Sequence, residues 1–460
     1  MEPSKTLKLT FAGGTGSVTG ANFLLEGEGK KFLIDCGLAQ GSKIAEQSNW
    51  KPFVYDPSTI DVLFITHAHI DHIGRIPKLV HDGFKGKIYS TIPTKEITEF
   101  MLADTANILS HAHDQVEAVK QMYSKEILDK TFQMWEVIDY HQDLAIGPFI
   151  FRYRDAGHVL GSGMLEIIYN NKKLIFTGDL GNSPSPLLRD TEALQNVDYL
   201  IMESVYGDRN HTARDERRVR LEGTIEDNYK NKGTLVIPTF SLERAQELLF
   251  EIDQLVEHDR IPEMPIFFDS PLAIKLTKVY SKYTRYFNDF ARKQIGEGDD
   301  IFNFPGLKFT LLTEESKEIL HEHNPKIVIA GSGMSNGGRI LHHEANYLPH
   351  ENNTLLLTGY QAEGTMGRMI QDGAKEIHIS GQSVPVRAHV VFIDGYSGHK
   401  DSDHLIEFVQ QIADNVKKVF VVMGEPKSSL FLTQRLRDYL GVQAFAPEEN
   451  DVVELDCNGK

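Results

Sequence analysis

Residues 66–72 read Thr66-His67-Ala68-His69-Ile70-Asp71-His72, and this run places four potential metal ligands within six residues. It follows a largely apolar run at residues 61–65, which predicts a buried β-strand. At a strand end that leads into a tight turn, His67 and His69 project to one side, and Asp71 and His72 can reach a nearby point. This spacing suits two adjacent metal ions, whereas a solvated polar loop has little reason to contain the set.

Further polar residues follow apolar runs elsewhere in the chain. They are His158, Asp179, Glu203 and His399. Because the loops that end the strands of a sheet often carry binding and catalytic residues, we expect these side chains to lie close to residues 67–72. A single histidine of this kind is often only structural, but the set as a whole indicates a metal centre.

Composition restricts the class of protein. The 460 residues include 48 Lys and Arg against 65 Asp and Glu, a formal net charge of −17, with 41% hydrophobic and 25% charged residues. No run approaches the roughly 18 apolar residues of a membrane span, and two cysteines are too few for a disulfide scaffold. The first residues also lack the apolar segment of a secretory signal. We therefore expect a cytoplasmic enzyme that does not bind nucleic acid through broad positive charge.

Changes in pattern divide the chain. Residues 1–208 are rich in short apolar runs typical of strands, interrupted by a helical stretch at about 93–137. Residues 209–380 contain strand, loop and helix units, which build parallel sheets. The strand-rich pattern returns in residues 381–460. This order predicts an α/β protein in which a second domain, residues 209–380, is inserted into the first.

These motifs are similar to those of a known family. The His-x-His-x-Asp-His run, together with Asp35, His158 and Asp179, resembles the metal-binding motifs of the metallo-β-lactamase superfamily. Residues 203–207 and 397–401 resemble two further motifs of its β-CASP nucleases, which include ribonucleases of the RNase J and pre-mRNA 3′-end cleavage factor types. Residues 330–339 and 359–365 look like signatures of the RNA-processing members. The resemblance implies a metallo-β-lactamase αββα sandwich with an inserted α/β β-CASP domain.

The resemblance also implies a function, namely zinc-dependent ribonuclease activity. RNA phosphodiester bonds would be hydrolysed by metal-bound hydroxide in the cleft between the two domains. One Zn²⁺ would be held by His67, His69 and His158 and the other by Asp71 and His72, with Asp179 bridging both. The catalytic residues would be His399, which donates a proton to the leaving group, Glu203, which orients that acid or the ligands, and Asp71, which orients the hydroxide.

Substrate contacts are expected in the glycine-rich loops at residues 331–338 and 359–365, each between a predicted strand and a helix. Backbone N–H groups of Ser332, Gly333 and Met334 could bind a phosphate there, although glycines that only form tight turns are an equal alternative. Arg244 and Arg339 lie near predicted helix starts and are candidate phosphate partners, with exposed surface charges as the alternative.

One position departs from the family pattern. RNA-directed members usually carry His-Gly-Glu where this chain reads Met423-Gly424-Glu425, and that His is normally a ligand of the second metal. A thioether is a weak ligand for Zn²⁺, so the second of the two sites is expected to be weak. The ligand types leave Zn²⁺, Mn²⁺ and Fe²⁺ open.

Met423 also keeps two alternatives to the ribonuclease open. The first is a non-catalytic RNA-binding or assembly subunit with a partly degenerate metal site, and the second is a small-molecule metallo-hydrolase. The expected partner is single-stranded RNA rather than a membrane, and a homodimer is a further expectation.

Overall fold

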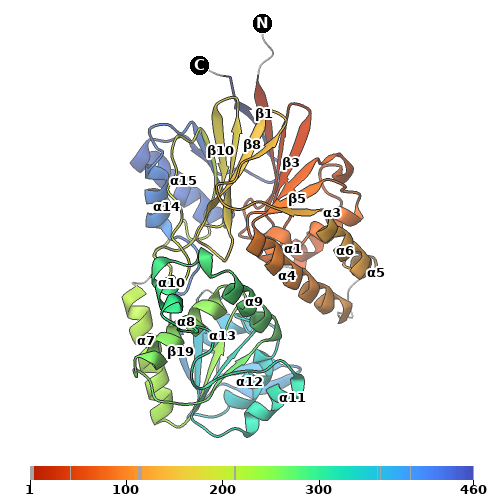
Figure 1. The fold of residues 1–460 in the computed structure, drawn as a ribbon. Helices are drawn as coiled ribbons and strands as arrows, with labels where there is room; N and C mark the ends of the chain where they lie inside the picture. Colours follow the sequence, from red (N-terminus) through yellow and green to blue (C-terminus); the bar gives the residue numbers. More distant parts are fainter. Residues whose placement is uncertain are drawn as a thin grey trace. The chain divides into compact units, whose positions relative to one another are not determined.

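The chain forms two compact units in the computed structural model, which describes residues 5–41, 43–111, 117–211, 214–359, 361–362, 364–393 and 395–458. The first unit comprises Met1–Asn210 and His399–Lys460, and the second comprises His211–Gly398. The second unit is therefore an insertion into the first, and both are built from sheets and helices (Figure 1).

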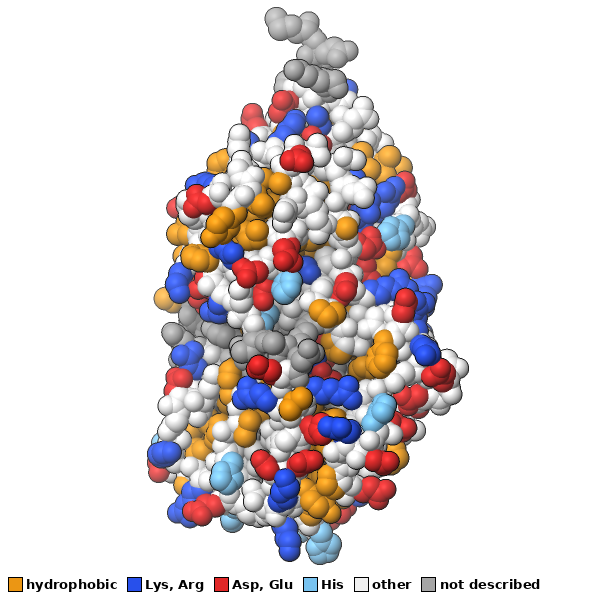
Figure 2. Space-filling view, turned by 90° about the vertical axis from the view of Figure 1, so that its left-hand side faces the viewer, with side chains coloured by type: hydrophobic (Ala, Val, Ile, Leu, Met, Phe, Trp, Pro, Cys, Tyr) orange, Lys and Arg blue, Asp and Glu red, His pale blue; other side chains and the backbone are white. Residues whose placement is uncertain are grey.

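The surface carries charges of both signs. On the face shown in Figure 2, Lys and Arg side chains lie interspersed with Asp and Glu side chains. Within the part of the chain that the structure describes, no helix is long and apolar enough to cross a membrane.

Two mixed sheets form the centre of the first unit. The strand order in one is β22 (Val452–Asp456), β1 (Thr6–Gly13), β2 (Asn22–Gly27), β3 (Lys30–Ile34), β4 (Val62–Phe64), β5 (Lys87–Ser90), β6 (Trp135–Val137). The order in the other is β21 (Ala444–Phe445), β20 (Lys418–Val422), β11 (Tyr199–Glu203), β10 (Lys172–Phe176), β9 (Gly163–Tyr169), β8 (Phe149–Asp155), β7 (Leu144–Ile146). Strands from β3 to β6 pair in parallel, as do β10, β11, β20 and β21.

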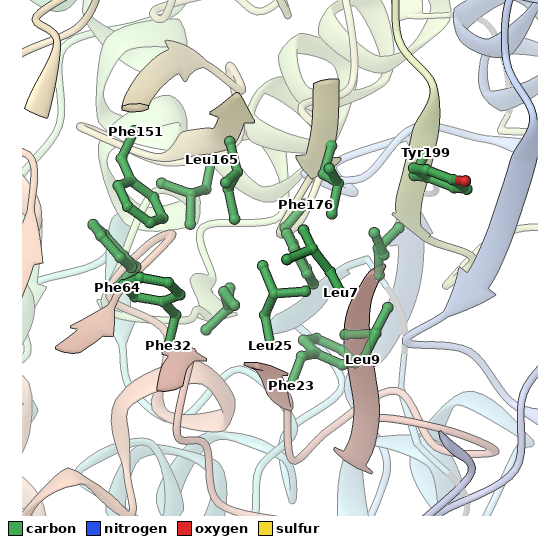
Figure 3. Close-up of a cluster of buried hydrophobic side chains, with 14 of the residues drawn as sticks. Leu7, Leu9, Phe23, Leu25, Phe32, Phe64, Phe151, Leu165, Phe176 and Tyr199 are labelled. Atoms are coloured by element: carbon green, nitrogen blue, oxygen red, sulfur yellow. The ribbon is translucent and has the colours of Figure 1, made fainter. Parts of the chain in front are cut away.

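The two sheets pack face to face through an aromatic core (Figure 3). Alternate residues of β8 are fully buried, as expected for a strand with one face toward a core. Phe64 of one sheet stacks on Phe151 of the other with ring centroids 4.4 Å apart, and Phe32 meets Phe149 at 5.0 Å. These contacts hold together the strand ends that carry the site.

Helices cover the outer faces of both sheets, which gives the αββα layers. The helices on the side of the first sheet are α2 (Ile70–Ile73), α3 (Ile76–His81), α4 (Ile92–His111), α5 (Glu117–Met122) and α6 (Lys125–Gln133). The short helix α1 (Lys43–Ser48) precedes them in the chain. Those against the second sheet are α14 (Ser402–Gln410) and α15 (Pro426–Leu440).

The second unit contains a parallel sheet in the order β14 (Leu307–Phe309), β13 (Ile266–Asp269), β15 (Lys326–Ala330), β12 (Thr234–Pro238), β16 (Thr354–Thr358), β19 (His389–Ile393). Strands β12, β15 and β16 are buried along their whole length, which explains why their sequences are largely apolar without alternation. The helices are α7 (Arg214–Lys230), α8 (Arg244–Glu257), α9 (Pro271–Lys282), α10 (Asp289–Gly296), α11 (Thr313–Glu318), α12 (Ile340–Tyr347) and α13 (Met366–Gln371). A hairpin of β17 (Glu376–Ile379) and β18 (Gln382–Pro385) precedes β19.

The inserted unit ends later in the chain than residue 380, where the sequence predicts its end. We predicted that residues 381–460 return to the first domain, but β19 pairs in parallel with β16 and extends the sheet of the second unit. The second unit therefore continues to Gly398. The apolar run at residues 387–393 shows that a strand forms, whereas the sheet it joins depends on pairing that the local sequence does not specify.

Candidate metal centre

The first group of donors comes from three loops of the first unit. His67 and His69 follow β4, His158 follows β8, and Asp179 follows β10. Nε2 of His67 lies 3.1 Å from Nδ1 of His69, and Nε2 of His158 lies 3.2 Å from the same atom. Oδ2 of Asp179 lies 3.4 Å from Nε2 of His67 and 3.6 Å from Nε2 of His158. Four donor atoms thus converge within 4.8 Å of one another, which is the arrangement that a divalent cation needs.

A second group lies beside the first. Asp71 and His72 belong to the single turn of α2, which begins directly after His69. Nε2 of His72 lies 3.3 Å from Oδ1 of Asp179 and 3.8 Å from Oδ2 of Asp71. The two carboxylate oxygens of Asp179 therefore face different groups. The structure brings together all six residues predicted as metal ligands.

Two atoms of this site show that the residues fit a bound cation. Nε2 of His72 and Oδ1 of Asp179 are buried and, within the described part of the chain, have no hydrogen-bond partner. Buried polar atoms are nearly always paired, so an unpaired nitrogen and oxygen 3.3 Å apart point to a positively charged species that both can bind. Imidazole nitrogen and carboxylate oxygen are suitable ligands for Zn²⁺ and similar ions.

Asp35 holds the histidine of the second group. It is buried, with φ of 57°, and its Oδ2 accepts hydrogen bonds from Nδ1 of His72 at 2.7 Å and from Oγ1 of Thr66 at 2.8 Å. Its Oδ1 accepts from the backbone N–H of Thr66 at 2.8 Å. Because Nδ1 of His72 donates, its Nε2 is left as the electron-pair donor toward the cation. Thr66 was not among the site residues that we predicted. The only feature of the sequence that could have indicated it is its position directly before His67.

The electrostatics of the centre agree with ligand roles. Burial lowers the pKa of His69 and His158 well below the usual value, which keeps both rings neutral. Burial also opposes a charge on His72, but the carboxylates of Asp179, Asp35 and Asp71 raise its pKa well above the usual value, so a cation that binds Nε2 would have to displace a proton from it. The pKa of Asp179 lies well below its usual value because His72 and His67 outweigh the effect of burial. Asp179 is therefore ionised.

His399 and Glu203 form a pair beside the first group. Nδ1 of His399 lies 3.1 Å from Oε1 of Glu203 and 3.9 Å from Oδ2 of Asp179. Glu203 is fully buried and also accepts a hydrogen bond from the backbone N–H of Leu180 at 2.6 Å. Burial alone would lower the pKa of His399, but Glu203 and then Asp179 raise it to about 9. The His399 side chain is 22% exposed, so a protonated imidazole can reach a substrate.

Met423 lies in the core between the two sheets. Its side chain is buried, and a Cβ built on Gly14 would stand 2.6 Å from its Sδ, so the sulfur lies directly against Gly14. Met423 lines the same small cavity as Asp35, Thr66 and His72. The backbone N–H of Met423 donates to the carbonyl of Gly14 at 2.7 Å. At the position where a histidine usually completes the second group, this chain places a packed thioether.

The predicted substrate contacts lie in the second unit. Ser332, Gly333 and Met334 form the loop after β15, where the N–H of Ser332 donates to the carbonyl of Gly337 at 3.1 Å. The guanidinium carbon of Arg244, at the start of α8, would stand 3.9 Å from a Cβ built on Gly359. Tyr360 and Glu363 of the second glycine-rich loop lie outside the described residues.

Arg339 differs from the expectation of an exposed phosphate partner. Its Nη1 donates to Oδ1 of the fully buried Asp269 at 2.6 Å and to the carbonyl of Thr310 at 2.9 Å, and its Nη2 donates to the carbonyl of Leu311 at 2.8 Å. A charged pair with a buried carboxylate is held by strong hydrogen bonds. Arg339 therefore anchors the loop after β15 to β13.

Comparison with known proteins identifies the family. Residues 16–217 match the metallo-beta-lactamase superfamily, residues 245–370 match the Beta-Casp domain, and residues 383–447 match the Zn-dependent metallo-hydrolase RNA specificity domain. Ribonuclease TTHA0252 of Thermus thermophilus is 33% identical over 430 residues, which cover 94% of this chain and 96% of that protein. The chain belongs to the β-CASP branch of the metallo-β-lactamase superfamily. This confirms the predicted family and fold class and makes the protein a metal-dependent hydrolase.

Other relatives extend the comparison. The RNase J-like protein of Methanocaldococcus jannaschii is 29% identical over 452 residues, 97% of this chain and 99% of that protein. Transcription termination factor FttA of Methanosarcina mazei is 29% identical over 466 residues, 98% of this chain and 72% of that protein. A protein of unknown function from Enterococcus faecalis shares the fold with a TM-score of 0.58 and 12% identity, covering 98% of this chain and 100% of that one.

Proposed function

We propose that this β-CASP protein is a zinc-dependent ribonuclease that hydrolyses phosphodiester bonds of single-stranded RNA. The observation that carries the proposal is the position of Asp179, whose two oxygens face the two donor groups and which lies 3.9 Å from Nδ1 of His399. Metal ligands and a proton donor thus share one centre. Relatives named as ribonucleases and the match to the RNA specificity domain support RNA as the substrate.

The residues of the metal centre would have separate roles in binding the two ions and in orienting the attacking water. His67, His69 and His158 would hold one ion and Asp71 and His72 the other, with Asp179 between them. Bound Zn²⁺ supplies Lewis acidity, which lowers the pKa of water from about 16 to about 7 and neutralises phosphate charge. Asp71, the more exposed carboxylate of the second group, would accept a hydrogen bond from the attacking water and orient it.

The leaving group also needs a proton. His399, protonated at neutral pH because of Glu203, would donate it to the departing ribose oxygen. Glu203 would keep the imidazole in place through the contact of 3.1 Å to Nδ1, which leaves Nε2 to face the substrate. The role of Glu203 is therefore to position the acid and stabilise its charge.

The experiment combines metal analysis with RNA cleavage. Purified protein is incubated with labelled single-stranded RNA before and after removal of metal by a chelator, and then after addition of Zn²⁺, Mn²⁺ or Fe²⁺. We expect cleavage that disappears with the metal and returns best with Zn²⁺. Asp179→Asn should lose both metal and cleavage, while Asp129→Asn, on the exposed surface of α6, should lose neither. Metal-independent cleavage, or none on any of several RNAs, would refute the proposal.

A non-catalytic RNA-binding subunit is the second candidate, and Met423 is the observation that favours it, because it removes a usual ligand. Relatives named as transcription termination factors are compatible with either role. RNA binding without cleavage by protein that contains less than about one zinc ion per chain would support this candidate. Cleavage of thioesters or lactones but not RNA would instead support a small-molecule hydrolase. Homodimer formation and a cytoplasmic location stay predictions.

A further inference from the structure

The parallel sheet of the second unit has a point where its connections diverge. Strands β12 and β15 are neighbours, but β12 leads through α8 to β13 on one side, while β15 leads through α12 to β16 on the other. Because crossover connections between parallel strands are right-handed, the two helices cover opposite faces of the sheet. The loops after β12 and β15 therefore leave the carboxyl edge toward opposite faces of the sheet, and in sheets of this kind ligands bind in the crevice outside such a point.

Phe240 stands at this crevice, two residues after the end of β12. It is 39% exposed although it is a large apolar side chain. A Cβ built on Gly333, in the loop after β15, would lie 2.6 Å from Cδ2 of Phe240, 2.8 Å from Cε2 and 2.9 Å from Cγ. Three consecutive ring atoms at nearly equal distances place Gly333 over the face of the ring rather than at its edge. Any side chain at position 333 would displace the ring.

The loop that supports the ring is held from several sides. Nε2 of Gln361 donates to the carbonyl of Gly333 at 3.1 Å, and the N–H of Asn336 donates to Oγ of Ser332 at 3.1 Å. Arg339 fixes the end of the loop to buried Asp269. The N–H of Thr239 donates to the carbonyl of Ala330 at 2.9 Å, which ties the two loops together. Phe240 is thus an exposed ring in a fixed orientation.

We propose that Phe240 is a stacking platform for one base of single-stranded RNA, so that the crevice between β12 and β15 is a base-binding subsite. This deepens the proposed function and rests on it. Every base has a π-face, so stacking on a fixed aromatic ring binds RNA with little sequence preference. Arg244 lies at the same edge of the sheet, at the start of α8, with its guanidinium carbon 3.9 Å from a Cβ built on Gly359, so positive charge is present at the edge that would receive the RNA.

The experiment measures stacking directly. Single-stranded RNA with 2-aminopurine placed at successive positions is titrated against metal-loaded full-length protein that carries His399→Ala to slow cleavage. Stacking quenches 2-aminopurine fluorescence, so one position should be quenched by the Phe240 protein. Phe240→Ala should abolish that quenching and weaken binding about 10-fold, and Phe240→Trp should retain both. The slope of log K against log salt concentration should stay unchanged in Phe240→Ala, because no phosphate contact is lost.

A matched control is Tyr229→Ala. Tyr229 is also 39% exposed, but it lies in α7 before β12, at the opposite edge of the sheet. The substitution Tyr229→Ala should leave the quenching of 2-aminopurine and the affinity for RNA unchanged. Equal behaviour of Phe240→Ala and Tyr229→Ala would overturn the inference, and so would a reduced salt slope in Phe240→Ala. If the protein with His399 intact cleaves no RNA while Phe240-dependent quenching persists, the proposed ribonuclease fails and the base subsite stands.

Discussion

Asp179 is the residue on which the metal centre depends most. It faces both donor groups and lies within 4 Å of nitrogen atoms from His67, His72, His158 and His399. It follows β10, which lies between β9 and β11 in the middle of its sheet. Because a central strand is held on both sides, the loop that follows it, with Asp179 three residues after Phe176, starts from a well-defined position. One aspartate can therefore set the geometry of both groups.

Met423→His should strengthen the second metal group. A fourth ligand for this group, and a second nitrogen donor beside His72, should raise bound zinc from about one ion per chain to nearly two. The measurement is elemental analysis after dialysis against metal-free buffer. Met423→Leu keeps an apolar side chain of similar size and serves as the control, with unchanged zinc. If Met423→His binds no more zinc than Met423→Leu, the thioether is not what weakens the site.

His399→Ala should lower kcat for RNA by about 10²- to 10⁴-fold, because a general acid would be lost, and it should leave the zinc content unchanged. A phosphodiester with a p-nitrophenolate leaving group needs no proton, so its hydrolysis should fall much less. His404→Ala is the control, since His404 lies nearby in α14 with a side chain that is 43% exposed. An equal loss of rate on both substrates would contradict the assignment of His399 as the acid.

Single elements place the functional side chains. In the first unit, α2 is only one turn long, and this turn separates His67 and His69 from Asp71 and His72.

In the second unit, α12 contains two buried polar residues, His343 and Glu344. Nε2 of His343 contacts Asp269 at 2.7 Å, whereas Oε2 of Glu344 has no partner among the described residues. Among the described residues Nδ1 of His343 also has no partner, but only Glu344 carries a carboxyl group whose charge burial opposes.

Glu344→Gln should stabilise the protein as pH rises. Burial raises the pKa of Glu344 to about 7, so the folded state retains a proton that the unfolded state loses above its pKa of about 4.5. The stability that this group contributes is present below pH 4.5 and is lost as pH rises to about 7. Glutamine stays neutral and can still accept the hydrogen bond from Oγ of Ser335.

The measurement is urea unfolding of both proteins at pH 5 and pH 8. Relative to the natural chain, Glu344→Gln should gain roughly 2–3 kcal/mol of unfolding free energy between these pH values. Glu318→Gln, on the exposed surface of α11, is the control and should show no such gain. A gain that does not depend on pH would show that Glu344 is already ionised in the folded state at pH 5.

At the scale of the whole molecule, the net charge of −17 must be reconciled with an anionic substrate. Acidic and basic side chains are interspersed over the face shown in Figure 2, so the excess of acid is spread out. Asp71, Asp179 and Glu203 lie in the metal centre, where bound divalent cations would reverse the local sign. We therefore expect RNA to bind only at a few positions and to be repelled elsewhere.

Salt dependence tests this expectation. For single-stranded RNA, the slope of log K against log salt concentration is about −0.7 per phosphate contacted, so about three contacts should give a slope near −2. The measurement is the affinity of the His399→Ala protein for a labelled RNA, by fluorescence anisotropy, at salt concentrations from about 50 to about 300 mM. A slope near −7, as for about ten contacts, would contradict binding confined to a few positions.

The sequence by itself determined the family and the kind of fold, because these depend on local patterns, and it predicted the six candidate metal ligands that the structure brings together. The buried strands at Lys326–Ala330 and Thr354–Thr358 have apolar centres, and residues 67–72 lie within one short stretch of sequence. Only the tertiary structure decided which sheet β19 joins, that Arg339 pairs with Asp269, and that Phe240 rests on Gly333. Each of these contacts joins residues far apart in the chain. Their meeting depends on strand order and register, which no local pattern encodes.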